Sequence, residues 1–168
     1  KIIRQGKRID LLGYNTDAEA FGETLKPLLR KDHKRALVLG TGGASKAVIY
    51  SLERLNIAFT LVSRQNSPGK LNYMTIDQQL ICEHQLIINA TPLGMHPEIS
   101  GSPSIPYQAL TPKHLLYDLV YNPEMTQFLK KGLAVGAQIK NGLEMLHLQA
   151  ELSWKTWNSS KFKVQIAK

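Results

Sequence analysis

A run of glycines between a short apolar segment and a helix-forming segment constrains this chain more than any other feature. Residues 36–40 read ALVLG, residues 44–56 read ASKAVIYSLERLN, and Gly40, Gly42 and Ser45 follow the spacing Gly-x-Gly-x-x-Ser. A buried strand that ends in glycine and is followed by a helix is typical of a dinucleotide-binding turn. Gly40 would permit the tight turn, and Gly42, which has no Cβ, would let a pyrophosphate approach the backbone.

The rest of this segment supports the same interpretation. Ser45 stands at the third position of the pattern, where a small residue lets helix and strand pack closely. Free N–H groups at the start of the helix would hold the phosphates. The alternative is a turn that only reverses the backbone. We interpret the segment as a cofactor site that consists of Gly40, Thr41, Gly42, Gly43, Ala44 and Ser45.

Short apolar runs alternate with helix-forming segments beyond this turn. The expected strands are residues 36–40, 58–63, 84–91 and 115–121, with a short fifth within 136–142, and the expected helices are 44–56, 125–132 and 143–158. Strands separated by helices predict an α/β fold with a doubly wound, mostly parallel, Rossmann-like sheet. Pro123 is expected near the first turn of the helix over 125–132, and Gly132 at its C-terminal end.

The first 35 residues have a different pattern. Residues 1–14 are compatible with a hairpin that turns at residues 5–7, and a helix is expected to follow. Thr16 and Glu19 have the spacing of a capping box at the start of that helix. The proline-rich segment 92–112 is expected to be irregular.

The end of the second expected strand bears on the choice of dinucleotide. An enzyme that uses NAD usually carries Asp or Glu there, ~20 residues after the glycines, to bind the ribose 2′-hydroxyl. This chain has Ser63 and Arg64 instead, and a guanidinium can pair with a 2′-phosphate. The residues favour NADP, with a solvated arginine at a strand end as the alternative interpretation of Arg64.

The net charge of +8 fits a nucleic acid, a polyanionic small ligand or a basic solvated surface. The lysines and arginines are scattered, so we expect no nucleic-acid partner. No apolar run approaches the ~20 residues that span a bilayer, and Cys82, the only cysteine, fits a reducing compartment. We expect a cytoplasmic protein with no membrane association. Because the chain opens at Lys1 rather than at methionine, we expect it to be a piece of something longer.

Six segments together resemble the shikimate dehydrogenase family, in order and in approximate spacing. They are GYNTD at 13–17, GTGGASKA at 40–47, VSR at 62–64, NATPLGM at 89–95, DLVYNP at 118–123 and NGLEMLHLQ at 141–149. The resemblance covers the chain to about Asn158. It departs from the family pattern at Ser63 and Gln65, where NRT is commoner, and at Ala18, where glycine usually follows the aspartate.

The resemblance implies reduction of 3-dehydroshikimate to shikimate with NADPH, in the pathway to aromatic amino acids. Members of the family have two domains. The first carries a serine pair, which is expected to precede residue 1, and the catalytic lysine of an NVTxPxK-like motif, which does not occur in these 168 residues. We therefore expect a remnant of the substrate domain at 1–14, an NADP-binding domain at 15–158 and a tail at 159–168, and we expect this part not to turn over alone.

The resemblance assigns three residues to the substrate. Asp17 matches the carboxylate that partners the catalytic lysine, Tyr121 a tyrosine that approaches the substrate, and Gln149 a glutamine that hydrogen-bonds it. From the residues alone, Asp17 would be a favourable charge in the first turn of a helix. Tyr121 would be a core side chain, whereas a buried Gln149 would need partners.

Further residues match cofactor positions of the family. Those at a strand end are Asn89, Ala90 and Thr91, and those near the nicotinamide are Leu119, Gly142 and Met145. The alternatives are a strand-to-loop turn for Asn89 and Thr91, and a core stripe for Met145. Residues 142, 145 and 149 lie on one face of the last expected helix. We expect no metal site.

Three other functions stay open. A methylene-tetrahydrofolate dehydrogenase has a similar nucleotide domain, but GYNTD and NGLEMLHLQ argue against it. A relative that oxidises quinate with NAD would want an acidic residue near Ser63. The third is a non-catalytic NADP-binding module. The expected partners are small molecules, shikimate or 3-dehydroshikimate, and a homodimer is left open.

Overall fold

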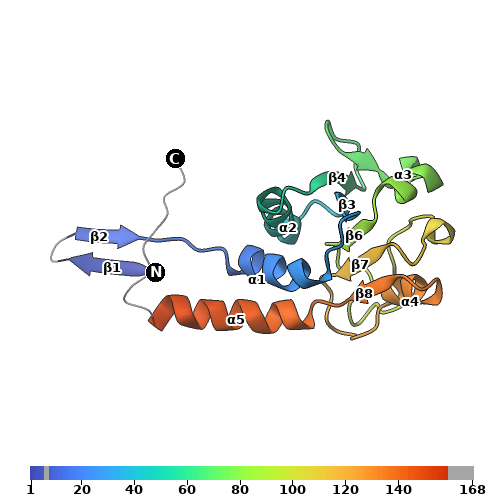
Figure 1. Cartoon of the computed structure of the whole chain (residues 1–168). Coiled ribbons are helices and arrows are strands. Elements are labelled where there is room, and N and C mark those ends of the chain that lie inside the picture. Colours follow the sequence, from blue (N-terminus) through green and yellow to red (C-terminus); the bar gives the residue numbers. More distant parts are fainter. Residues whose placement is uncertain (6–7, 159–168) are drawn as a thin grey trace.

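A computed structural model describes residues 1–5 and 8–158 and places six strands in one sheet, which Figure 1 shows with its helices. The strands are parallel and run in the order β5-β4-β3-β6-β7-β8. They are β3 (Arg35–Leu39), β4 (Ala58–Ser63), β5 (Leu71–Asn72), β6 (Leu86–Asn89), β7 (Leu115–Asp118) and β8 (Gln138–Lys140). From β3 the chain adds β4 and β5 toward one edge of the sheet, and it then returns to the other side of β3 and adds β6, β7 and β8 toward the opposite edge. The strand order therefore reverses between β3 and β6. The predicted doubly wound, Rossmann-like sheet is therefore confirmed, and its switch point lies where such sheets bind ligands.

Helices cover both faces of this sheet. One face carries α1 (Thr16–Leu25), α2 (Gly43–Arg54) and α5 (Leu143–Asn158), and the other carries α3 (Gln78–Glu83) and α4 (Gln127–Ala134). Short 3₁₀ turns are η1 (Lys26–Leu28), η2 (Tyr73–Thr75) and η3 (Tyr107–Ala109). Residues alternate along a strand, so Ala36 and Val38 of β3 pack in the first core, and Leu37 and Leu39 pack in the second. A strand buried on both faces explains the continuous apolar run of the sequence.

Two predictions about helix ends are wrong: the residue that caps the start of α1, and the residue at which α4 ends. Asn15, rather than Thr16, caps α1, because the Asn15 Oδ1 accepts the N–H of Ala18 at 3.0 Å. The Thr16 hydroxyl instead lies 3.1 Å from the hydroxyl of Ser153 on α5. Helix α4 does not end at Gly132, since it continues to Ala134.

Gly132 serves packing rather than termination. A Cβ on it would lie 2.5 Å from Leu116 Cδ2, so a larger residue would require the buried Leu116 side chain or α4 itself to shift. The residue with a positive φ after the helix is Gly136, at 77°. Pro123 lies before the helix, whose cap is Thr126: its Oγ1 accepts the N–H of Leu129 at 3.3 Å.

The N-terminal hairpin was predicted, and its strands are β1 (Ile2–Gln5) and β2 (Arg8–Leu11), which pair antiparallel. Its predicted turn includes residues 6–7, which lie outside the described residues, as does the predicted tail 159–168. The hairpin extends away from the sheet, beyond the ends of α1 and α5, which lie side by side (Figure 1). Lys1 Nζ donates to the carbonyl of Thr156 at 3.2 Å, which joins the hairpin to α5. Among the described residues, no helix combines the length and apolarity needed to cross a membrane.

Candidate nucleotide-binding site

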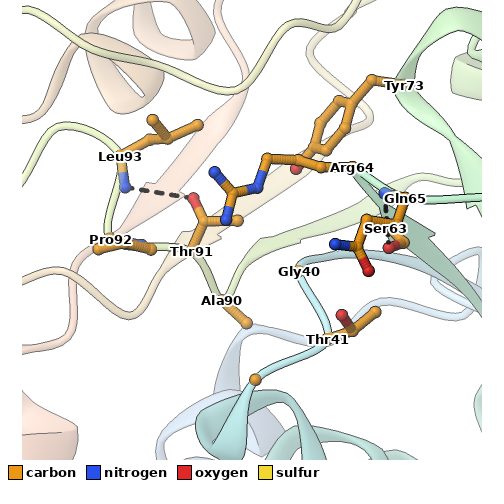
Figure 2. A pocket seen from close by; sticks show the side chains of 11 residues that line it. Gly40, Thr41, Ser63, Arg64, Gln65, Tyr73, Ala90, Thr91, Pro92 and Leu93 are labelled. Atoms are coloured by element: carbon orange, nitrogen blue, oxygen red, sulfur yellow. Dashed lines mark hydrogen bonds between the residues drawn. The ribbon is translucent and has the colours of Figure 1, made fainter.

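The carboxyl ends of β3, β4 and β6 surround a cavity of about 720 Å³ (Figure 2). It is lined by Gly40, Thr41, Gly42, Ser63, Arg64, Gln65, Tyr73, Ala90, Thr91, Pro92 and Leu93. Seven of these residues were predicted to bind the cofactor. The three strand ends meet because all parallel strands of the sheet end at the same edge, as the sequence pattern predicted.

Glycine suits positions 40 and 42 of the turn for different physical reasons. Gly40 has a φ of 109°, and a Cβ on it would lie 2.9 Å from both the Ala90 carbonyl oxygen and Thr91 Cγ2. The fold itself therefore requires glycine there. Gly42 has an ordinary φ of −80°, and a Cβ on it would meet nothing within 4 Å. Gly42 leaves open space rather than relieving a clash.

The start of α2 faces this open space. Gly42 is its N-cap and makes no side-chain capping bond, so the first N–H groups of the helix have no capping side chain. Ser45 does not line the cavity: it is buried, and its hydroxyl donates to the Gly42 carbonyl at 2.7 Å. The loop is thus held from behind, and its front can take an anion.

Arg64 lies on the rim formed by the end of β4. Figure 2 shows its side chain reaching across the cavity toward Thr91. Among the ion pairs of the described residues, none involves Arg64. Ser63 turns inward and accepts the N–H of Gln65 at 3.1 Å. An arginine without a carboxylate partner, exposed beside an open glycine turn, suits a phosphate.

Tyr73, from η2, was not among the predicted residues of this cavity. Within the described part of the chain, its hydroxyl is buried with no hydrogen-bond partner. Burial raises the pKa of Tyr73, and the positive charge of Arg64 works against that rise. Nothing in the local sequence marks Tyr73, because β5 and η2 are too short to give a periodic pattern.

Asn89 stands behind the cavity wall rather than on it. Its side chain is completely buried, and its Nδ2 donates to Asp118 Oδ1 at 2.9 Å. Its Oδ1 accepts both the N–H and the hydroxyl of Thr91, at 3.1 and 2.6 Å. Thr91 and the neighbouring Ala90 line the cavity. The alternative interpretation of Asn89, a residue that satisfies a strand-to-loop turn, matches these contacts.

Asp118 is a buried carboxylate at the end of β7 that sequence reasoning did not single out. It accepts three hydrogen bonds, from Asn89, from the N–H of Val120 at 3.0 Å and from the hydroxyl of Thr126 at 2.6 Å. Burial nevertheless raises the pKa of Asp118 to about 6, and the three donors only partly offset it. A carboxylate at the end of an apolar strand was the available signal.

The predicted substrate residues lie on three separate elements. Asp17 is exposed in the first turn of α1, Tyr121 is 45% exposed after β7, and Gln149 is half-buried on α5. None of them lines the cavity at the strand ends. The Thr16–Ser153 hydroxyl contact joins α1 to α5 beside Asp17.

Gly142 and Leu119, predicted near the nicotinamide, touch each other. A Cβ on Gly142 would collide with the Leu119 carbonyl, and the Gly142 N–H donates to Val120 O at 3.1 Å. Met145, on α5, belongs to the core between that helix and the sheet. The predicted cofactor residues that lie outside the cavity lining include Gly43, Ala44, Leu119, Gly142 and Met145. Within residues 1–5 and 8–158, no three His, Cys, Asp or Glu side chains gather as metal ligands would.

Comparison with known proteins identifies relatives of this arrangement, although no protein-family model matches the chain. The chain is 38% identical to the shikimate dehydrogenase (NADP(+)) of Halothermothrix orenii, over 95% of this chain and 62% of that protein. The shikimate 5-dehydrogenase of Thermus thermophilus, solved with NADP(H) and shikimate, is 30% identical with a TM-score of 0.76, over 94% of this chain and 60% of that one.

A quinate dehydrogenase from Corynebacterium glutamicum, solved with NAD, is 25% identical with a TM-score of 0.75, over 87% of this chain and 57% of that one. The chain spans about 60% of the length of the curated relatives it matches. By sequence and by fold, the chain is a homologue of the shikimate dehydrogenases over the part of those proteins that it spans.

Proposed function

We propose that the chain is the nucleotide-binding part of a shikimate dehydrogenase that uses NADP to interconvert 3-dehydroshikimate and shikimate. The observation that carries the proposal is one cavity lined by both an open glycine turn and an arginine with no ion-pair partner among the described residues. The similarity to proteins of that name supports it.

The residues of the cavity fit NADP. The backbone around Gly42 and the start of α2 would hold the pyrophosphate, and Arg64 would hold the 2′-phosphate. When bound, the nicotinamide supplies the hydride, and the protein contributes position and electrostatics. A quinate dehydrogenase that uses NAD is the less favoured alternative, because the end of β4 carries Ser63 and Arg64 where a carboxylate would bind the 2′-hydroxyl.

The substrate residues belong to the same proposal. Asp17 would accept a hydrogen bond from the substrate and pair with a lysine that moves the proton. Tyr121 and Gln149 would orient the substrate. The family's lysine motif does not occur in these 168 residues. We therefore propose that this polypeptide alone binds NADP without turning over shikimate.

Small molecules are the proposed partners, and the cytoplasm is the proposed location. Scattered rather than clustered lysines and arginines support a small anionic ligand over a nucleic acid. A single cysteine, Cys82, is in keeping with a reducing compartment.

The experiment is a calorimetric titration of the chain with NADP and with NAD. We expect NADP to bind more tightly, and Arg64→Ala to lower that preference by about ten- to a hundredfold, since a charged hydrogen bond contributes about 1.5–3 kcal/mol. Arg35→Ala is the matched control. It removes one exposed positive charge at the opposite end of the sheet, where Arg35 lies 3.6 Å from Glu83. An unchanged NADP-to-NAD ratio in Arg64→Ala would refute the assignment.

A further inference from the structure

We propose that Asp118 is a positioning residue of the nucleotide site, which acts through Asn89 on the cavity wall at residues 90–93. The proposal rests on the proposed function, because that function makes the wall part of an NADP site. Asp118 itself is completely buried and lies outside the cavity lining. Its influence therefore passes through the side chains that it contacts.

The first step is the orientation of the Asn89 amide. The two ends of an amide have nearly the same shape but opposite hydrogen-bonding roles. Asp118 Oδ1, which accepts from Asn89 Nδ2 at 2.9 Å, requires that the NH₂ end face β7. The carbonyl end of Asn89 must then face residue 91. Asn89 Nδ2 also donates to the Leu93 carbonyl at 3.4 Å, which favours the same orientation. The buried carboxylate is the nearer and charged acceptor of the two, so it contributes most to the choice between two orientations of similar shape.

The second step is the shape of the wall. With this orientation, Asn89 Oδ1 accepts the Thr91 N–H at 3.1 Å and the Thr91 hydroxyl at 2.6 Å. The Thr91 hydroxyl oxygen in turn accepts the Leu93 N–H at 3.3 Å, and Figure 2 shows this bond across the wall. Thr91 also backs onto the glycine turn, because its Cγ2 occupies the space beside Gly40. A flipped Asn89 would present a donor to the donors of Thr91 and would release both neighbours.

The other carboxylate oxygen of Asp118 makes a separate hydrogen bond, which provides an internal control. Asp118 Oδ2 accepts the Thr126 hydroxyl at 2.6 Å, and Thr126 caps α4 through the Leu129 N–H. Removal of the Thr126 hydroxyl would disturb Asp118 and loosen α4. It would leave the bond between Asp118 Oδ1 and Asn89 in place.

The test compares Asp118→Leu, Asp118→Asn and Thr126→Val by amide hydrogen exchange of the folded chain, without any ligand. In Asp118→Leu we expect the protection of the Thr91 and Leu93 amides to fall by about tenfold, the effect of one lost hydrogen bond to a charged group. Asp118→Asn keeps an acceptor for Asn89 and should leave Thr91 within about threefold of the original protection. In Thr126→Val the loss should appear at Leu129 and not at Thr91.

The same variants are then titrated with NADP. We expect the Kd to rise about tenfold in Asp118→Leu and to change less than about threefold in Asp118→Asn and Thr126→Val. If Asp118→Leu does not fold, Asp118→Ser, whose hydroxyl is too short to reach Asn89, takes its place. Unchanged exchange at Thr91 in Asp118→Leu, or an equal loss at Thr91 in Thr126→Val, overturns the proposal. If the unsubstituted chain does not bind NADP, the proposed function fails, and the exchange data still decide the role of Asp118.

Discussion

The carboxyl edge of the sheet and the predicted substrate residues differ in how much of a site the chain completes. At the edge, three strand ends, a glycine turn and a buried network enclose one cavity. Asp17, Tyr121 and Gln149 lie on α1, on the segment after β7 and on α5. They do not line that cavity. They also do not line a second cavity, of about 730 Å³, which lies between α1 and α2.

The difference follows from the kind of contact that each group makes. The Thr91 hydroxyl donates to Asn89, and the Asn89 amide donates to Asp118, so hydrogen bonds within the chain fix the positions of both side chains. The side chain of Asp17 is exposed. We infer that the proposed cradle for the nucleotide is preorganised, whereas no comparable buried network holds the exposed side chain of Asp17 among the described residues.

The largest expected effect is on turnover. Residues 1–168, with the mass of the preparation verified, should bind NADP but form no detectable NADPH from shikimate. Missing general acid–base help costs about 10²–10⁴ in rate, and loss of the orienting groups costs more, because hydride transfer requires a close, aligned approach. NADPH absorbance measures the rate. Robust turnover by this polypeptide would mean that the reaction does not need the family's lysine.

The second effect is on nucleotide affinity. Gly42→Val places a branched side chain in the open space where the pyrophosphate would lie, and its φ of −80° allows that change without backbone strain. We expect NADP affinity to fall by about a hundredfold or more while the fold persists, since the close approach of backbone and pyrophosphate is lost. Calorimetry and circular dichroism measure the two properties.

The matched control is Gly13→Val. A Cβ on Gly13 also meets nothing within 4 Å, but this residue lies outside the cavity at the strand ends. NADP affinity should be unchanged in that variant. Normal NADP binding by folded Gly42→Val would contradict the cradle.

The fold was predictable wherever a pattern was long. The strand at 58–63 and the helix at 143–158 were predicted with the bounds that the structure has, because each is a continuous apolar or amphipathic run. Strand β5 and helix α3 have two and six residues, too few for a period. The predicted end at Gly132 failed because glycine marks close packing as well as helix ends, and here Leu116 leaves no room for a side chain.

The sequence predicted many of the residues that line the candidate site, but not the buried contacts behind them. The cavity lining includes the first three predicted residues of the glycine turn, residues 63–64 at the end of β4, and residues 90–91, since each follows directly from its place at a strand end. The predicted residues 43–45 lie outside it. The positions of Asn89 and Asp118 relative to one another were not predictable. Their bond joins residues 29 positions apart on neighbouring strands, and only the pairing of β6 with β7 places them together.

The third effect is on the pH dependence of stability. The pKa of Asp118 is about 6 in the folded chain, against an ordinary value of 3.8, so the folded state binds its proton more tightly. Protonation of Asp118 therefore stabilises the folded state relative to the unfolded state. This contribution to the free energy of unfolding is fully present below about pH 4 and is lost as pH rises to about 6. We expect the stability of the unsubstituted chain relative to Asp118→Asn to fall by about 2–3 kcal/mol over that interval. Urea unfolding at several pH values measures it, and parallel curves would contradict the prediction.

The smallest expected effect distinguishes an exposed carboxylate from a buried one. Asp17→Asn removes a charge from the first turn of α1, where an acidic residue contributes about 0.3–1 kcal/mol through the helix dipole. The change should lower stability by no more than this and should leave NADP affinity within about twofold, because Asp17 lies outside the cavity lining. Calorimetric titration beside Asp118→Leu makes the contrast direct. A large loss of NADP affinity in Asp17→Asn would show that the two sites are not separate, and that the substrate residues already form part of the nucleotide site.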